Sequence, residues 1–123
     1  MLRPSNREIC GKVADALVAL RAGRFQIGTL KHLSGDLDAL GIDTADLCPL
    51  LMELLEEIQE AGPIRCYAGT RPPQRSYERE LLNLELWAYS WHSSCLQKRM
   101  YLKFVLKKEC YIYVDCHEDS PPE

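Results

Sequence analysis

Side chains that handle phosphate groups and protons gather in the second half of this chain. Arg71 and Arg75 flank the dipeptide Pro72–Pro73, and the two prolines restrict the backbone, so less entropy is lost when these arginines bind an anion. A guanidinium group pairs with phosphate through two parallel hydrogen bonds. The stretch therefore predicts a stiff loop that holds phosphate.

His117 adds a group that can move protons. Imidazole is the side chain whose unperturbed pKa suits proton transfer in either direction at neutral pH. Cleavage of RNA without a metal needs a base for the ribose 2′-hydroxyl, a cation for the charged phosphorane and an acid for the leaving 5′-oxygen. His117 with Arg71 and Arg75 would supply parts of that set, so RNA cleavage without a metal or other cofactor is one expected chemistry.

Aromatic and cationic side chains alternate with aliphatic ones along residues 84–89, 99–106 and 110–117. This alternation predicts three half-buried strands. Bases stack on aromatic rings while cations meet the phosphates, so such a face is typical of a nucleic-acid platform. A face covered by helices would hold the same residue types, since Trp and Tyr are good strand formers. The face opposite the aliphatic core would display Trp87, Tyr89, Trp91, Arg99, Tyr101, Lys103, Tyr111, Tyr113 and His117.

Charge is distributed unevenly along a chain whose net charge is −3. Residues 1–62 hold six basic and ten acidic side chains, residues 63–108 hold nine and three, and residues 109–123 hold none and five. The basic block predicts a local anion site, although the solvated face of a sheet would give the same distribution. The side chains expected to contact RNA are Arg71, Arg79, Trp87, Tyr89, Arg99 and Tyr113.

About three helices are expected before the strands. Ser5–Glu8 has the form of a capping box and opens the first helix, which Gly23 would end. Residues 29–40 favour a second, shorter helix, and the leucines of residues 47–58 form the clearest amphipathic stripe in the chain.

The remaining segments complete the expected layout. Residues 64–68 favour a short strand, residues 71–80 a loop, residues 107–109 a hairpin connection and residues 118–123 a polar tail. Helices followed by strands indicate an α+β fold, with the helices packed on an antiparallel sheet of three to four strands. The 123 residues suit a single domain, helical over residues 1–62 and forming the sheet over residues 63–117.

The six cysteines show no C-x-x-C pair. A zinc site of Cys110, Cys116 and His117, with His92, can be drawn, but zinc modules usually show paired short spacings. No apolar run reaches the length of a membrane span, and the polar N-terminus lacks the apolar region of a signal peptide. We therefore expect a cytoplasmic protein with free thiols and no bound metal.

Five segments in order, "LRAGRFQ", "DALGIDTADLCPLL", "LELWAYSW", "RMYLKFVL" and "YIYVDCHE", resemble the MqsR-type toxins of bacterial toxin–antitoxin systems. The resemblance runs from about Leu20 to Glu118. Those toxins are RelE-like endoribonucleases that cut messenger RNA. The resemblance implies a RelE-like fold, cleavage of single-stranded mRNA by acid/base chemistry, an antitoxin partner and an association with the ribosome.

The resemblance also assigns roles to residues. The family's catalytic tyrosine falls on Tyr101, its strand lysine on Lys103, its loop Lys-Ser pair on Arg75-Ser76 and its C-terminal lysine on His117. The expected catalytic residues are therefore Tyr101, His117, Arg75 and Lys103.

One departure from the family supports an alternative. The Trp-Gln pair of the family becomes Trp87-Ala88, so a polar catalytic side chain is missing. A non-catalytic module that binds nucleic acid or protein on the same fold is the alternative expectation.

Overall fold

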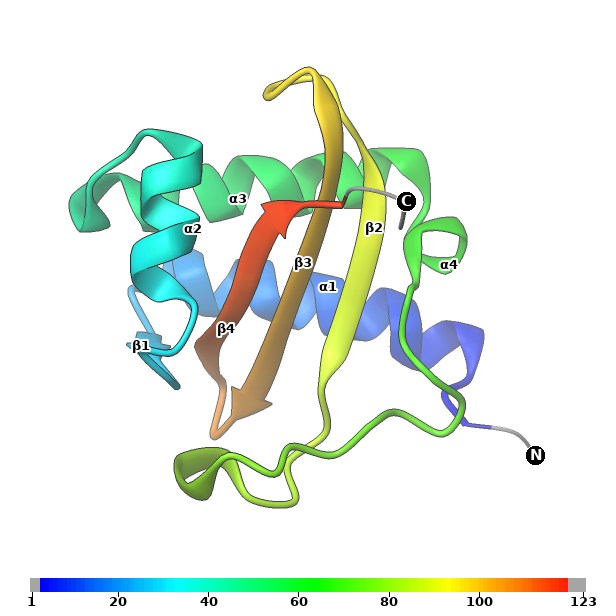
Figure 1. Ribbon diagram of the computed structural model, residues 1–123. Helices are drawn as coiled ribbons and strands as arrows, with labels where there is room; N and C mark the ends of the chain where they lie inside the picture. The colour runs from blue at the N-terminus through cyan, green and yellow to red at the C-terminus, as the bar shows by residue number, and fades with distance from the viewer. Residues whose placement is uncertain (1–2, 120–123) are drawn as a thin grey trace.

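The three long strands follow the α-helices along the chain, while a short strand lies between the first two helices. The elements form two layers in the computed structural model, which describes residues 3–119 (Figure 1). Helices α1 and α3 lie side by side across one face of the sheet. The elements in chain order are α1 (Asn6–Arg21), β1 (Phe25–Ile27), α2 (Leu33–Leu40), α3 (Thr44–Ala61), α4 (Pro63–Cys66), the 3-10 helix η1 (Arg79–Leu81), β2 (Trp87–Ser93), β3 (Lys98–Lys107) and β4 (Cys110–Glu118).

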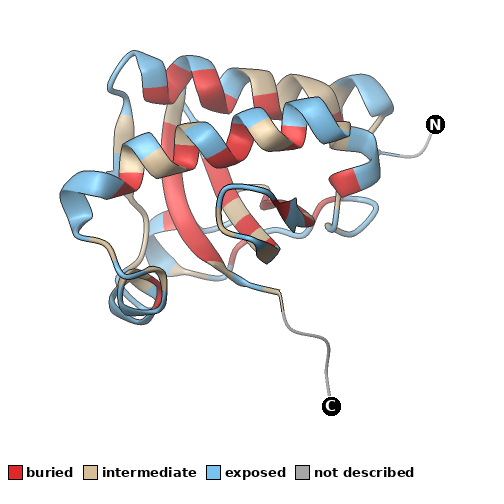
Figure 2. Cartoon of the chain, turned by 90° about the horizontal axis from the view of Figure 1, so that it is seen from above, coloured by how far each residue is buried: buried red, intermediate tan, exposed pale blue. Residues whose placement is uncertain are grey.

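The two long helices form as their sequences predict. The Ser5 hydroxyl accepts the Glu8 N–H at 3.1 Å, and the Glu8 carboxylate accepts the Ser5 N–H at 3.2 Å, which confirms the capping box. Asp43 caps α3. Both helices turn an apolar stripe toward the sheet, so buried residues concentrate between the layers (Figure 2). In α3 the stripe consists of Leu47, Leu51, Leu54, Leu55 and Ile58, all with no exposed surface.

The sheet is mixed, in the order β1-β4-β3-β2, because β1 runs parallel to β4 while the other pairs are antiparallel. The expectation of a purely antiparallel sheet was therefore wrong. Strand β1 has only three residues, too few to show an alternating pattern in the sequence. The strand expected over residues 64–68 does not form. Its first residues belong to α4, and Tyr67 makes an isolated β-bridge to Tyr89.

The hairpin between β3 and β4 follows the expected connection. Lys108 and Glu109 have φ values of +51° and +62°, which is the conformation of a type I′ turn, whose twist matches that of antiparallel strands. Beyond this hairpin, β4 extends to Glu118. The part of the expected polar tail after Asp119 lies outside the described residues.

The predicted facing of β2 was wrong. Trp87, Tyr89 and Trp91 pair with Phe104, Leu102 and Met100 of β3, and directly paired residues share a face of the sheet. All six side chains are buried in the main core under the helices. A shift of one residue exchanges the two faces of a strand, and aromatic residues do not reveal which face they occupy.

A β-bulge changes the facing within β4. Lys103 pairs with Asp115 while the next residue, Phe104, pairs with Tyr113, so Val114 is an extra residue in β4. Before the bulge, Tyr111 and Tyr113 therefore point under the helices, contrary to the expected placement. After the bulge, Asp115 and His117 point to the opposite face, which we call the outer face.

The outer face has two halves. Near the hairpin turn of β3 and β4, a second small core is closed by the segment of residues 71–86. Near the other end of these strands lies the polar half of the outer face, over which residues 3–119 place no apolar cover of this kind. The second core consists of Leu81, Leu86, Val105, Ile112 and Val114. The polar half consists of Ser90, His92, Arg99, Tyr101, Lys103, Asp115, His117 and Asp119.

Candidate active site on the outer face

Tyr101 and His117 form the centre of the polar half. They are direct partners in the register of β3 and β4. Their rings stack with centroids 5.2 Å apart and planes inclined by 23°. Both side chains are half-buried, so they are held in place by the sheet and still reach solvent. The two expected proton-handling residues therefore lie together.

Lys103 places a cation beside this pair. Its Nζ lies 5.6 Å from the centroid of the Tyr101 ring and 3.7 Å from Oδ2 of Asp115. Asp115 is buried and also lies 3.8 Å from Nε2 of His32, the residue before α2. The carboxylate thus anchors two side chains from different elements. Neither Asp115 nor His32 was among the expected site residues. Alternation places Asp115 on the face of His117, whereas the position of α2 leaves no signal in the sequence.

The Tyr101 hydroxyl is a hydrogen-bond donor at neutral pH. Burial raises the pKa of Tyr101 to about 12, and the negative charges of Asp115 and Asp119 add to the shift. A phenol with such a pKa stays protonated at pH 7. Tyr101 can therefore donate its proton to an oxygen of a substrate, while it is unsuited to be the base.

His117 is oriented to accept a proton. Its Nδ1 lies 2.9 Å from the backbone carbonyl oxygen of Glu118. Since a carbonyl oxygen only accepts, the neutral ring carries its proton on Nδ1 and leaves Nε2 as the acceptor. An imidazole with a free Nε2 suits the role of general base.

A second carboxylate lines the edge of the site. Ser90, the register partner of Tyr101, donates its hydroxyl to Oδ2 of Asp119 at 2.5 Å. Arg99 is exposed, and its Nε lies 3.6 Å from the same oxygen. Asp119 therefore holds Arg99 and Ser90 next to Tyr101.

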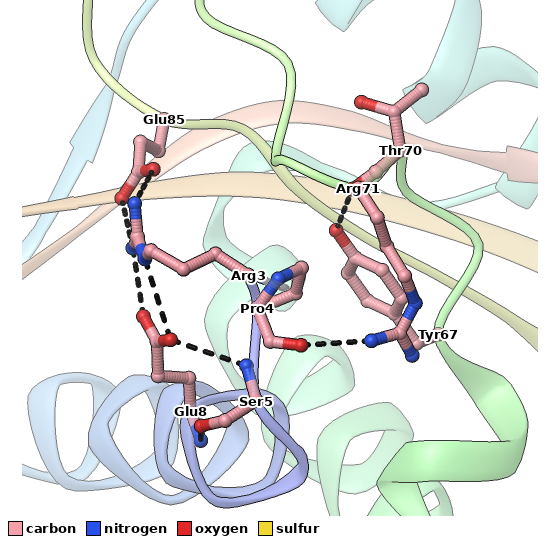
Figure 3. A network of polar contacts seen from close by, with 8 residues as sticks. All are labelled: Arg3, Pro4, Ser5, Glu8, Tyr67, Thr70, Arg71 and Glu85. Atoms are coloured by element: carbon pink, nitrogen blue, oxygen red, sulfur yellow. Dashed lines mark hydrogen bonds and ion pairs between the residues drawn. The ribbon is translucent and has the colours of Figure 1, made fainter. Parts of the chain in front are cut away.

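The loop arginines do not join this site. Arg71 donates to the carbonyl oxygen of Pro4 at 2.8 Å, and its guanidinium lies 5.5 Å from the centroid of the Tyr67 ring (Figure 3). Arg75 lines a cavity with Lys12 and Leu106, and Leu106 is roughly 17 Å along β3 from Tyr101 at the usual rise per residue. The expected arrangement of Arg71 and Arg75 beside Tyr101 and His117 was wrong.

The segment of residues 71–86 contacts the start of the chain instead (Figure 3). Arg3 lies 2.7 Å from a carboxylate oxygen of Glu8 and 3.0 Å from one of Glu85. Arg79 lies in η1 and is exposed. The arginines of this region therefore contribute to holding the loop against α1 or face solvent.

Three of the expected stacking residues are in the core. Trp87 is 2% exposed and Tyr89 and Tyr113 are fully buried. The Tyr89 hydroxyl donates to the carbonyl oxygen of Ile9 at 2.8 Å, and the Tyr113 hydroxyl donates to Asp36 at 2.5 Å. Their faces cannot meet a base, so their expected role in RNA binding was wrong.

The zinc arrangement drawn from the sequence does not form. Cys116 is buried under the helices, while the next residue, His117, points to the outer face. Two side chains on opposite faces of one strand cannot converge on one ion. Within residues 3–119, no group of three or more His, Cys, Asp or Glu side chains is placed to hold a metal ion.

Over residues 3–119, no helix combines the length and hydrophobicity that crossing a membrane requires.

The comparisons with known proteins assign no family to this chain. No protein-family model, curated protein or solved structure matches it.

Proposed function

We propose that this protein is a toxin-like endoribonuclease that cleaves single-stranded mRNA by metal-independent acid/base chemistry. The observation that carries the proposal is the stack of Tyr101 on His117 beside Lys103, on the face of the sheet opposite α1 and α3. The base, the acid and the cation that the reaction needs thus come from three neighbouring positions on two strands.

Each residue has a role in the proposed reaction. Nε2 of His117 takes the proton of the ribose 2′-hydroxyl, and the 2′-oxygen forms a bond to phosphorus. The bond from phosphorus to the 5′-oxygen breaks, and the Tyr101 hydroxyl gives its proton to that leaving oxygen. Lys103 faces the negative charge that develops on the phosphorane. The products are a 2′,3′-cyclic phosphate and a 5′-hydroxyl end.

The resemblance to the MqsR-type toxins supports the same proposal. Tyr101, Lys103 and His117 are three of the four positions it assigns to catalysis, and they are close together, whereas the fourth, Arg75, lies away from them. A RelE-like fold, an antitoxin that covers the outer face and an action on ribosome-bound mRNA belong to this proposal. The α+β order of helices before a four-stranded sheet is compatible with it.

Two observations favour the alternative, a module on the same fold that binds nucleic acid or protein without cleavage. Ala88 is the register partner of Lys103, so the glutamine position of the family borders the site and offers no polar group. Asp115 and Asp119 lie close to Lys103 and Arg99 and offset part of their positive charge.

The test is incubation of the purified protein with single-stranded RNA of mixed sequence in EDTA. We expect fragments ending in a 2′,3′-cyclic phosphate, and a loss of roughly 100- to 10,000-fold in rate for Tyr101→Phe and for His117→Ala. Tyr77→Phe is the matched control, because Tyr77 is 88% exposed.

A second arm uses mRNA in the presence of ribosomes, to detect a nuclease that depends on them. Salt-sensitive RNA binding with no cleavage in either arm would contradict the nuclease proposal and favour the binding module.

A further inference from the structure

A cavity of about 340 Å³ lies beside β2, the edge strand next to β3, and shares Ser90 and Arg99 with the candidate active site. Its polar lining comes from three elements: Arg65 from α4, His92 from β2 and Arg99 from β3. Its apolar lining includes Cys66 and Trp91, both buried. Nothing in the proposed reaction uses Arg65 or His92.

The lining is rich in hydrogen-bond donors. Within residues 3–119, no carboxylate oxygen lies within 4.0 Å of a side-chain nitrogen of Arg65 or His92. His92 and Arg99 are direct partners across β2 and β3, so both project from the same face. An anion between these side chains would accept hydrogen bonds from each of them.

The cavity brings together two arginines that are 34 positions apart in the chain. Arg65 and Arg99 both line it, beside the buried Cys66. In agreement with this placement, burial raises the pKa of the Cys66 thiol and the positive charges of Arg65 and Arg99 partly oppose that shift. Nε of Arg99 also lies 3.6 Å from Asp119, so the guanidinium of Arg65 is the donor that the test addresses.

The cavity continues from the candidate active site. Ser90 pairs with Tyr101, and His92 pairs with Arg99 on the same face, two residues along the strands. At the rise of a strand this is about 7 Å, a step comparable with one nucleotide of an extended single strand. We propose that the cavity binds the phosphate of single-stranded RNA that neighbours the phosphodiester held at Tyr101 and His117, an inference that rests on the proposed function for its substrate.

The test separates binding from cleavage. The probe is a short single-stranded RNA with every ribose 2′-O-methylated, which cannot react through its 2′-oxygen. Its dissociation constant is measured at several salt concentrations for the wild type and for Arg65→Gln. We expect Arg65→Gln to weaken binding about tenfold and to reduce the slope of log K against log salt by about one.

Two further variants complete the experiment. Arg65→Lys keeps the charge without the paired hydrogen bonds, so we expect an affinity between those of the wild type and Arg65→Gln. Arg21→Gln is the matched control, because Arg21 is an exposed arginine at the end of α1, in the helix layer. Thermal unfolding of each variant checks that the fold is intact.

The outcomes are distinguishable. An affinity and a salt slope of Arg65→Gln equal to those of Arg21→Gln would overturn the cavity proposal, as would no binding of the probe by the wild type. If Arg65→Gln shows the expected loss while unmodified RNA is never cleaved, the cavity stands as a phosphate site and the proposed nuclease function fails.

Discussion

The two halves of the outer face are built on the same strands and differ in what covers them. Near the β3–β4 turn, Val105 and Ile112 are closed by Leu81 and Leu86 of the preceding segment. At the other end, Tyr101, Lys103 and His117 remain half-buried. The sequence predicts one site made of the arginine loop and the polar strands, whereas the structure separates a packed half from a reactive half.

The difference explains what the proline- and arginine-bearing segment contributes. Its apolar residues complete a second core, and contacts of Arg3 and Arg71 connect it to the start of α1 (Figure 3). The segment therefore closes one half of the face and leaves the chemistry to the other.

The largest expected effect tests the separation directly. His117→Ala should lower the RNA cleavage rate by roughly 100- to 10,000-fold, because it removes the proposed base. Arg75→Gln should leave the rate within about twofold, since Arg75 lies in the packed half and exposed substitutions away from a site change little. Initial rates on one RNA give both numbers. A comparable loss of cleavage rate for Arg75→Gln would show that both halves of the outer face contribute to one catalytic site.

The second prediction concerns the stability of the packed half. Leu81→Ala should lower the free energy of unfolding by roughly 2–4 kcal/mol, because Leu81 is 2% exposed in the second core. Leu82→Ala is the control from the next position, which is 58% exposed, and should change stability by less than about 0.5 kcal/mol. Urea denaturation measures both, and equal effects would mean that the segment does not close a core.

The third prediction uses pH to examine the reactive half. The phenol of Tyr101 loses its proton near pH 10 in the unfolded chain and near pH 12 in the fold. The folded state therefore holds more protons in this window, so stability falls as the pH rises from 10 to 12. Tyr101→Phe should make this fall shallower, as seen in the pH dependence of the urea midpoint. An unchanged fall would show that Tyr101 is not buried as described.

The smallest expected effect concerns the ties of the loop. Arg3→Gln removes the ion pairs to Glu8 and Glu85, which are exposed and contribute little to stability. Hydrogen exchange in residues 70–86 should become faster, while RNA cleavage stays at the wild-type rate. A loss of cleavage instead would connect the loop to catalysis.

The sequence was informative where a pattern is local and long. The capping box and the leucine stripe of α3 predict their helices because many residues agree on one periodicity. The three C-terminal strands and the turn between the last two were also recognisable, although the first of them spans Trp87–Ser93 and not residues 84–89. Strand β1 was not recognisable, because its three residues are too few to show an alternating pattern.

The candidate site was predictable only in part. Tyr101, Lys103 and His117 were expected on one face of the sheet and lie on one face, but whether Tyr101 meets His117 depends on the register of β3 and β4, which the sequence does not reveal. Trp87, Tyr89 and Tyr113 were placed on the wrong face, because an aromatic side chain suits a core as well as a surface and a single extra residue reverses the alternation. Asp115 was overlooked, although alternation alone places it on the face of His117.

Val114 is a hydrophobic residue with no chemical role, yet the bulge that holds it determines which way the reactive half faces. Because of the bulge, Tyr113 and His117 lie on opposite faces of the sheet although four positions separate them. If the same residues paired without a bulge, strict alternation would turn Asp115 and His117 under the helices, and Cys116 would face the solvent in place of the imidazole. The bulge is therefore as essential to the proposed catalysis as the identity of the residues.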